Sequence, residues 1–166
     1  MKIETKRLTI RTLVETDLSE YEKVVNEAML SCMSAKEFLA WNMSHYSVMD
    51  IINSTVCFGV FDRDDNFMGI VGAGKHDDLH ESEIFYELLP DVRGKGYATE
   101  AVKAITSWAF ANFDIPFIIG TAAVDNIKSQ SVLVRCDYKL IDERTLLVHV
   151  EGKEYKFKYY RNYRTK

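Results

Sequence analysis

Arg93-Gly94-Lys95-Gly96-Tyr97-Ala98-Thr99-Glu100-Ala101 separates an extended apolar run that ends at Pro90 from an amphipathic helix predicted to begin near Gly96. Two glycines allow the backbone to turn tightly and to approach a ligand closely. The start of the following helix leaves about four peptide N–H groups without partners, and the positive end of the helix dipole lies at the same point. Together these features predict a binding site for a diphosphate.

Length and composition indicate one ordinary globular domain over residues 1–166, because 47% of the residues are hydrophobic and 28% are charged. The net charge of −4 gives no overall attraction to nucleic acid or to anionic lipid. The sequence begins without an apolar segment of signal-peptide length, and no run approaches the ~18 apolar residues of a membrane span. We therefore expect a cytoplasmic protein that does not bind membranes.

The cysteines Cys32, Cys57 and Cys136 are widely separated, and no Cys-x-x-Cys pair or histidine cluster accompanies them. This pattern favours reduced thiols and predicts no metal site.

The spacing of apolar residues predicts the element order β-α-α-β-β-β-α-β-α-β-β. The first strand is expected over residues 3–11, and a capping box at Ser34 marks the second helix. The other expected strands cover residues 56–61, 67–75, 82–89 and 117–123, and two more strands, separated by a turn at 151–153, lie within residues 138–163. The later helices are expected over residues 96–113 and 126–136.

Two common nucleotide-binding motifs do not fit the glycine turn. A dinucleotide-binding unit needs a third glycine where this chain has Thr99, and it occurs near the start of a βαβ repeat. A P-loop needs Gly-Lys-Ser or Gly-Lys-Thr, which the chain lacks. The remaining pattern is Arg-x-x-Gly-x-Ala, formed by Arg93, Gly96 and Ala98.

This pattern resembles the acetyl-CoA signature of the GNAT acetyltransferase superfamily. The likeness extends over nearly the whole chain and is similar to the subgroup that acetylates the N-termini of ribosomal proteins. It includes Ile3–Leu8, Ser82–Pro90, Arg93–Ala101, Asn126, Ser129, Val132, Leu133 and Arg135. The resemblance implies an α+β fold with a mixed, twisted sheet of six to seven strands flanked by helices. Its fourth and fifth strands would splay apart and hold the pantetheine arm of acetyl-CoA, the expected cosubstrate.

The resemblance also implies which residues bind the coenzyme. Asn126 and Ser129 would contact the pantetheine arm, although Asn126 is equally well explained as the N-cap of the following helix with Ser129 at its third position. The full implied set is Leu88, Leu89, Arg93, Gly94, Lys95, Gly96, Tyr97, Ala98, Thr99, Asn126 and Ser129.

Glu83 and Glu87 are the candidate catalytic residues. On an alternating strand they share one face with Phe85. The resemblance aligns Glu83 with the strand glutamate that acts as the base in histone-type members; the alternative for both residues is a solvated edge carboxylate. A main-chain N–H near Glu87 or Leu88, freed by a bulge or splay, is expected to bind the oxyanion.

The chain departs from the family pattern at three places. Phe85 stands where the subgroup often has glycine, and Asp137-Tyr138 replaces a frequent Gly-Phe. Leu133 occupies the position of the tyrosine that serves as the general acid in many members, so no tyrosine acid carries over to this chain.

The expected activity is direct transfer of an acetyl group from acetyl-CoA to a primary amine, with a protein N-terminus as the acceptor. Alternatives are a small amine such as a polyamine, an amino acid or an aminoglycoside, and a non-catalytic acyl-CoA-binding module; a homodimer is a candidate assembly. Residues 26–55, rich in methionine and aromatics, are expected either to shape the acceptor pocket or to form ordinary core. The basic and aromatic tail fits a half-solvated strand better than a nucleic-acid surface.

Overall fold

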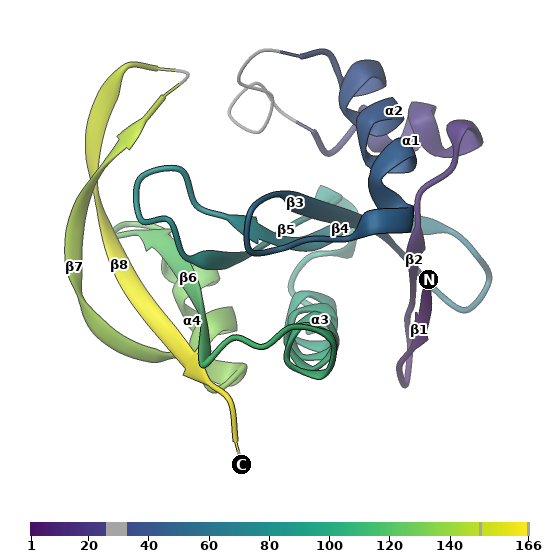
Figure 1. Cartoon of the computed structure of the whole chain (residues 1–166). Coiled ribbons are helices and arrows are strands. Elements are labelled where there is room, and N and C mark those ends of the chain that lie inside the picture. The colour runs from purple at the N-terminus through teal and green to yellow at the C-terminus, as the bar shows by residue number, and fades with distance from the viewer. Residues whose placement is uncertain (26–32, 150, 166) are drawn as a thin grey trace.

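The computed structural model describes residues 1–25, 33–149 and 151–165, and within them eight strands form one sheet in the order β1-β2-β3-β4-β5-β6-β8-β7 (Figure 1). All neighbouring strands are antiparallel except β5 and β6, which are parallel. The strands are β1 Lys2–Glu4, β2 Thr9–Thr12, β3 Thr55–Phe61, β4 Phe67–Lys75, β5 Ser82–Leu88, β6 Phe117–Ala123, β7 Lys139–Val148 and β8 Lys153–Tyr163.

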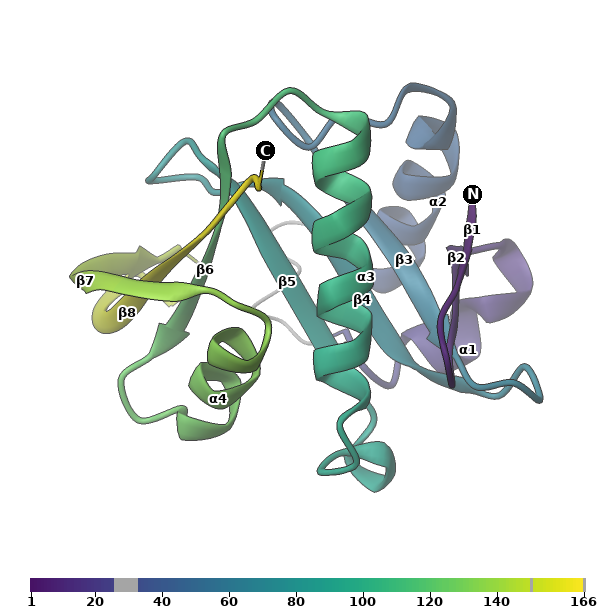
Figure 2. The same cartoon turned by 90° about the horizontal axis from the view of Figure 1, so that it is seen from below.

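Helices cover both faces of this sheet. Helices α1 (Leu18–Tyr21) and α2 (Ala35–His45) lie on one face, and α3 (Tyr97–Asn112) and α4 (Ile127–Arg135) lie on the other (Figures 1 and 2). Short 3₁₀ helices occur at Glu15–Asp17, Tyr46–Val48 and Pro90–Val92. The predicted α+β architecture and the later helices are confirmed, with ends that differ by one residue.

The prediction of six to seven strands was wrong, because the N-terminal segment forms two strands instead of one. The break falls at the polar run Thr5-Lys6-Arg7, where the Thr5 N–H donates to the Leu8 carbonyl at 2.9 Å and the Leu8 N–H donates to Thr5 Oγ1 at 3.0 Å. A threonine hydroxyl that bonds to nearby backbone in this way competes with extended structure. The result is a hairpin that pairs Lys2 with Arg11.

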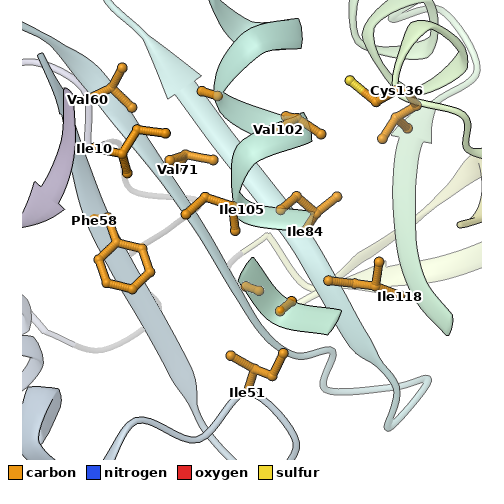
Figure 3. Packing of buried hydrophobic residues seen from close by; sticks show 14 of the residues in the cluster. Ile10, Ile51, Phe58, Val60, Val71, Ile84, Val102, Ile105, Ile118 and Cys136 are labelled. Carbon is orange, nitrogen blue, oxygen red and sulfur yellow. The ribbon is translucent and has the colours of Figure 1, made fainter. Parts of the chain in front are cut away.

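The apolar face of α3 forms the centre of the main core. Val102 and Ile105 are fully buried and point toward Val71 and Ile84 of the sheet (Figure 3). A helix with one apolar stripe must bury it, and full burial of one such side chain contributes roughly 1.5–3 kcal/mol. This packing holds the first turn of α3 against the end of β5. A smaller second core lies on the other face: Leu13, Tyr21, Val24, Leu39, Cys57 and Ile70.

The predicted splay lies between β5 and β6. Seven residue pairs join β4 to β5, whereas β5 and β6 share the single pair Glu83–Ile119. The Leu89 N–H donates to the Met68 carbonyl, so odd-numbered residues of β5 bond to β4. Because backbone groups alternate along a strand, the N–H groups of Tyr86 and Leu88 face the side from which β6 has departed.

Candidate active site

The glycine turn places a row of main-chain donors at the start of α3. Gly94 and Gly96 have φ of 79° and 82°, in the left-handed region that favours glycine. Gly96 is the N-cap and has no side chain to cap the helix. Within the part of the chain that the structure describes, no backbone carbonyl accepts from the N–H groups of residues 94–99. These donors and the helix dipole therefore suit an anion.

A groove of about 610 Å³ leads away from this turn and runs between β5, the start of α3 and α4. Its volume lies within the usual range for small-molecule sites. It is lined by Tyr86, Glu87, Leu88, Arg93, Gly94, Gly96, Tyr97, Ala98, Thr99, Asn126, Lys128, Ser129, Ser131, Val132 and Arg135. Most of the residues implied by the family resemblance therefore lie around one hollow.

Three predicted site residues do not line the groove. Leu89 packs against the second core, while Lys95 turns its ammonium group back to the Asp91 carbonyl at 3.3 Å. The N–H of Lys95 nevertheless belongs to the open row of donors. Glu83 shares the register position of Gly74 on β4 and bonds to β6, away from the groove lining.

From α4, the sequence analysis assigned only Ser129 to the coenzyme site and missed four further residues of this helix. Lys128, Ser131, Val132 and Arg135 line the groove opposite the glycine turn. Their spacing of three, four and seven residues puts them on one side of a helix, and this periodicity was the available signal. Two of the four are cations, so the groove has positive charge on the side facing the row of amides.

Asn126 caps α4, as the alternative reading expected, because its Oδ1 accepts from the Ser129 N–H at 3.1 Å. The Ser129 hydroxyl lies 2.7 Å from the Tyr86 hydroxyl. Burial raises the pKa of Tyr86 to about 12, more than the bond to Ser129 lowers it. Tyr86 therefore remains protonated at neutral pH, and its hydroxyl proton is directed to Ser129, whose carbonyl oxygen lies 3.2 Å away.

Glu83 joins the two strands where they part. Its Oε1 accepts from the Thr121 N–H at 2.9 Å and from the Thr121 hydroxyl at 2.6 Å. This side-chain bridge takes the place of the next rung of the β5–β6 ladder. Burial raises the pKa of Glu83 above its usual value, outweighing the opposing effects of His76 and of the bonds from Thr121.

Glu87 is in a different environment. Its Oε1 pairs with Arg93 Nη2 at 2.6 Å, and Arg93 Nε donates to the Leu88 carbonyl at 2.8 Å. Both side chains are partly exposed. Arg93 therefore ties the loop after β5 to the strand, and it neutralises Glu87 at the groove.

The three departures from the family pattern have structural explanations. Asp137 adopts φ of 66°, a conformation that glycine adopts most easily and that aspartate tolerates. Phe85 has room because Gly72 lies beside it, where an added Cβ would come within 2.3 Å of the Phe85 ring. Leu133 is 1% exposed within the main core, so its position supplies packing.

A second hollow of about 300 Å³ lies on the α2 side. Its lining comprises Met33, Phe38, Trp41, Asn53, Ser54, Thr55, Lys75 and Asp77. It includes part of the expected acceptor region, while Tyr46 and Met49 pack against the core. Residues 26–32, with Met29 and Cys32, lie outside the described residues; the other cysteines, Cys57 and Cys136, are free and buried.

The basic and aromatic tail is a strand with partners on both sides. Residues 157–163 of β8 pair with β6, and much of β8 also pairs with β7. The strand itself is confirmed, but Tyr159 and Tyr160, which point to opposite faces of it, are both buried. The expected pattern of one core face and one solvated face was therefore wrong at this point. Among the described residues, no group of three or more His, Cys, Asp or Glu side chains is arranged to hold a metal ion. No helix in the described ranges is both long and apolar enough to cross a membrane.

Comparisons with known proteins agree with this geometry. Residues 7–139 match the family model described as an acetyltransferase (GNAT) domain. The chain is 30% identical over 143 residues to YnaD of Bacillus subtilis (strain 168), an uncharacterized N-acetyltransferase, and the match covers 80% of this chain and 79% of that protein.

Solved structures share the fold. A GNAT-family acetyltransferase from Bacillus anthracis superposes with a TM-score of 0.78 at 20% identity, covering 98% of each chain. A putative ribosomal-protein-serine acetyltransferase from Vibrio cholerae gives 0.73 at 15% identity, over 99% of this chain and 98% of the other. A spermidine/spermine N-acetyltransferase from Vibrio cholerae gives a TM-score of 0.73 at 20% identity, covering 95% of this chain and 92% of the other. The family match over most of the chain, on a fold with an open amide row and a splayed strand pair, shows that this protein belongs to the GNAT acetyltransferase family.

Proposed function

We propose that the protein transfers the acetyl group of acetyl-CoA directly to a primary amine, with a protein N-terminal amine as the acceptor. The observation that carries this proposal is the row of unpartnered N–H groups at residues 94–99, which opens into the groove beside the β5–β6 splay. Acetyl-CoA supplies an activated thioester carbonyl. The amine nitrogen bonds to the carbonyl carbon, the carbon–sulfur bond breaks, and coenzyme A leaves as the thiolate. In this reaction the residues of this chain hold the carbonyl, polarise it and accept a proton from the amine.

The groove residues have complementary binding roles in this proposal. The amides of residues 94–99 hold the diphosphate, and Lys128 and Arg135 add positive charge from the opposite wall. Asn126 and Ser129 contact the pantetheine arm. The N–H groups of Tyr86 and Leu88 face the space between the separated strands, where a polarised carbonyl oxygen would find donors without strand partners.

Glu83 is the general base in this mechanism. An attacking amine is mostly protonated at pH 7, since reference pKa values are near ~10.4 for lysine and ~8 for a chain terminus. Burial raises the pKa of Glu83 and makes it a stronger base than an exposed carboxylate. Glu87 is the second candidate, but its pairing with Arg93 occupies one of its oxygens.

A small-molecule amine is the second candidate acceptor. It is supported by the hollow that contains Phe38, Trp41 and Asp77, because aromatic faces and a carboxylate attract ammonium groups. The hollow includes Thr55, which pairs with Gly74, the strand neighbour of Glu83. Thr55 and Glu83 are thus separated by one strand, about 10 Å across the sheet.

Two measurements on the pure protein test the proposal. Isothermal titration with acetyl-CoA tests whether the groove binds the coenzyme. A thiol-release assay over N-terminal peptides, polyamines, amino acids and aminoglycosides tests which amine accepts the acetyl group. Faster release with peptides than with small amines is expected. Binding without release for any acceptor would identify an acyl-CoA-binding module, and no binding of acetyl-CoA would refute the proposal.

A further inference from the structure

The turn between β1 and β2 contacts the glycine turn that precedes α3, although the two segments are about ninety residues apart in the chain. Arg7 Nη1 donates to the Lys95 carbonyl at 2.9 Å, and Arg7 Nε bonds to Glu100 Oε2 at 2.7 Å. The Arg7 guanidinium also lies over the Tyr97 ring, 4.4 Å from its centroid. One side chain therefore touches both the loop and the first turn of α3.

Glu100 completes the connection. Its Oε1 accepts from the Arg7 N–H at 2.7 Å and from the Thr5 hydroxyl at 2.6 Å. The Glu100 side chain is only 17% exposed. Burial pushes the pKa of Glu100 upward, but the bonds from Thr5 and Arg7 outweigh it and the net pKa lies below the usual value. Glu100 is therefore a carboxylate held by three donors of the N-terminal hairpin.

The charge of Glu100 conflicts with diphosphate binding. A carboxylate in the first turn of a helix interacts favourably with the dipole, but it also competes with and repels an anionic ligand at the same helix end. The Arg7 guanidinium neutralises that carboxylate and at the same time fixes the Lys95 carbonyl away from the row of donors. Loss of Arg7 would thus loosen the loop and expose a negative charge beside it.

We infer that Arg7, through its bonds to Glu100 and the Lys95 carbonyl, is a positioning residue that keeps the 94–99 amides ready for the coenzyme diphosphate. This inference rests on the proposed use of acetyl-CoA. It assigns a role to the N-terminal hairpin, whose residues do not line the groove.

The test compares Arg7→Gln with wild type by isothermal titration and steady-state kinetics. Loss of charge-assisted hydrogen bonds is expected to raise the Kd and KM for acetyl-CoA by about tenfold or more. The kcat and the KM for the amine stay within about twofold, because Arg7 does not reach the reacting atoms. The KM for S-acetylpantetheine, which lacks the diphosphate, is unchanged, a result that a general loss of structure would not produce.

Two further variants separate charge from geometry. Arg7→Lys restores the positive charge but cannot bond to Glu100 and the Lys95 carbonyl together, so intermediate affinity is expected. The double variant Arg7→Gln/Glu100→Gln removes the exposed charge and is expected to bind acetyl-CoA better than Arg7→Gln alone. Lys2→Gln is the matched control: it removes one positive charge from the same hairpin, where Lys2 forms an exposed ion pair with Glu4.

Wild-type affinity for acetyl-CoA in Arg7→Gln, or an equal rise in the KM for S-acetylpantetheine, overturns the positioning role and leaves the proposed function standing. Failure of the wild-type protein to bind acetyl-CoA overturns both. Thermal unfolding of each variant verifies that the comparison is made between folded proteins.

Discussion

Replacement of Glu83 by glutamine separates its proposed role as a general base from its structural role. Glutamine retains an oxygen that can accept from the Thr121 N–H and hydroxyl, so the bridge between β5 and β6 survives. It has no proton-accepting carboxylate. Loss of a general base lowers kcat/KM by about 10²–10⁴-fold, which corresponds to about 2.7–5.4 kcal/mol in the activation free energy. The Kd for acetyl-CoA is expected to change by less than about twofold, because Glu83 is not a groove-lining residue.

The assay is thiol release measured between pH 5 and pH 9. In wild type the acid limb of kcat/KM should have its midpoint above the usual glutamate pKa, because burial raises the pKa of Glu83. Glu83→Gln lacks this limb. Thr121→Val removes one donor to the carboxylate and should move the limb to higher pH, whereas a purely structural bridge would lower activity equally at every pH.

The pKa of Glu83 also predicts a pH dependence of stability. Since the pKa of Glu83 is raised in the folded state, the folded protein holds the Glu83 proton more tightly than the unfolded chain does. The stability that this proton contributes is present at low pH and is lost as pH rises through the folded-state pKa. Relative to wild type, Glu83→Gln should therefore gain stability with rising pH.

Activity of Glu83→Gln within about threefold of wild type, with the acid limb retained, would refute the assignment of Glu83 as the base.

Three other changes test the site and the core. Gly96→Ala must hold a left-handed φ of 82°, so it should cost about 1–2 kcal/mol of stability in urea unfolding and weaken acetyl-CoA binding; an unaltered Kd would contradict the role of the turn. Lys128→Gln with Arg135→Gln should raise the Kd for acetyl-CoA more strongly at low salt, and a salt-independent effect would contradict an electrostatic role. Ile105→Ala leaves a cavity under α3 and should cost about 2–5 kcal/mol in urea unfolding; a loss below about 1 kcal/mol would show that the core collapses around it.

Local patterns in the chain were enough to predict the glycine turn and the helix start of the candidate site. The glycines of the 93–101 turn, the apolar stripe of α3 and the Pro90 stop are all short-range signals, and each depends on backbone geometry within a few residues. The order of strands and helices followed from the same kind of periodicity. The strand count failed at Thr5–Leu8, where a side-chain bond to nearby backbone competes with extension.

The environments of the charged groups depend instead on contacts between distant segments. The environment of Glu83 depends on Thr121, thirty-eight residues later, and that of Glu100 depends on Arg7, ninety-three residues earlier. The cations of α4 face the amides of α3 only because the β6 crossover brings the two helices together. Sequence spacing carries no information about such pairs, since burial and Coulomb interactions depend on distance in space, and that distance is set when the sheet and its helices pack.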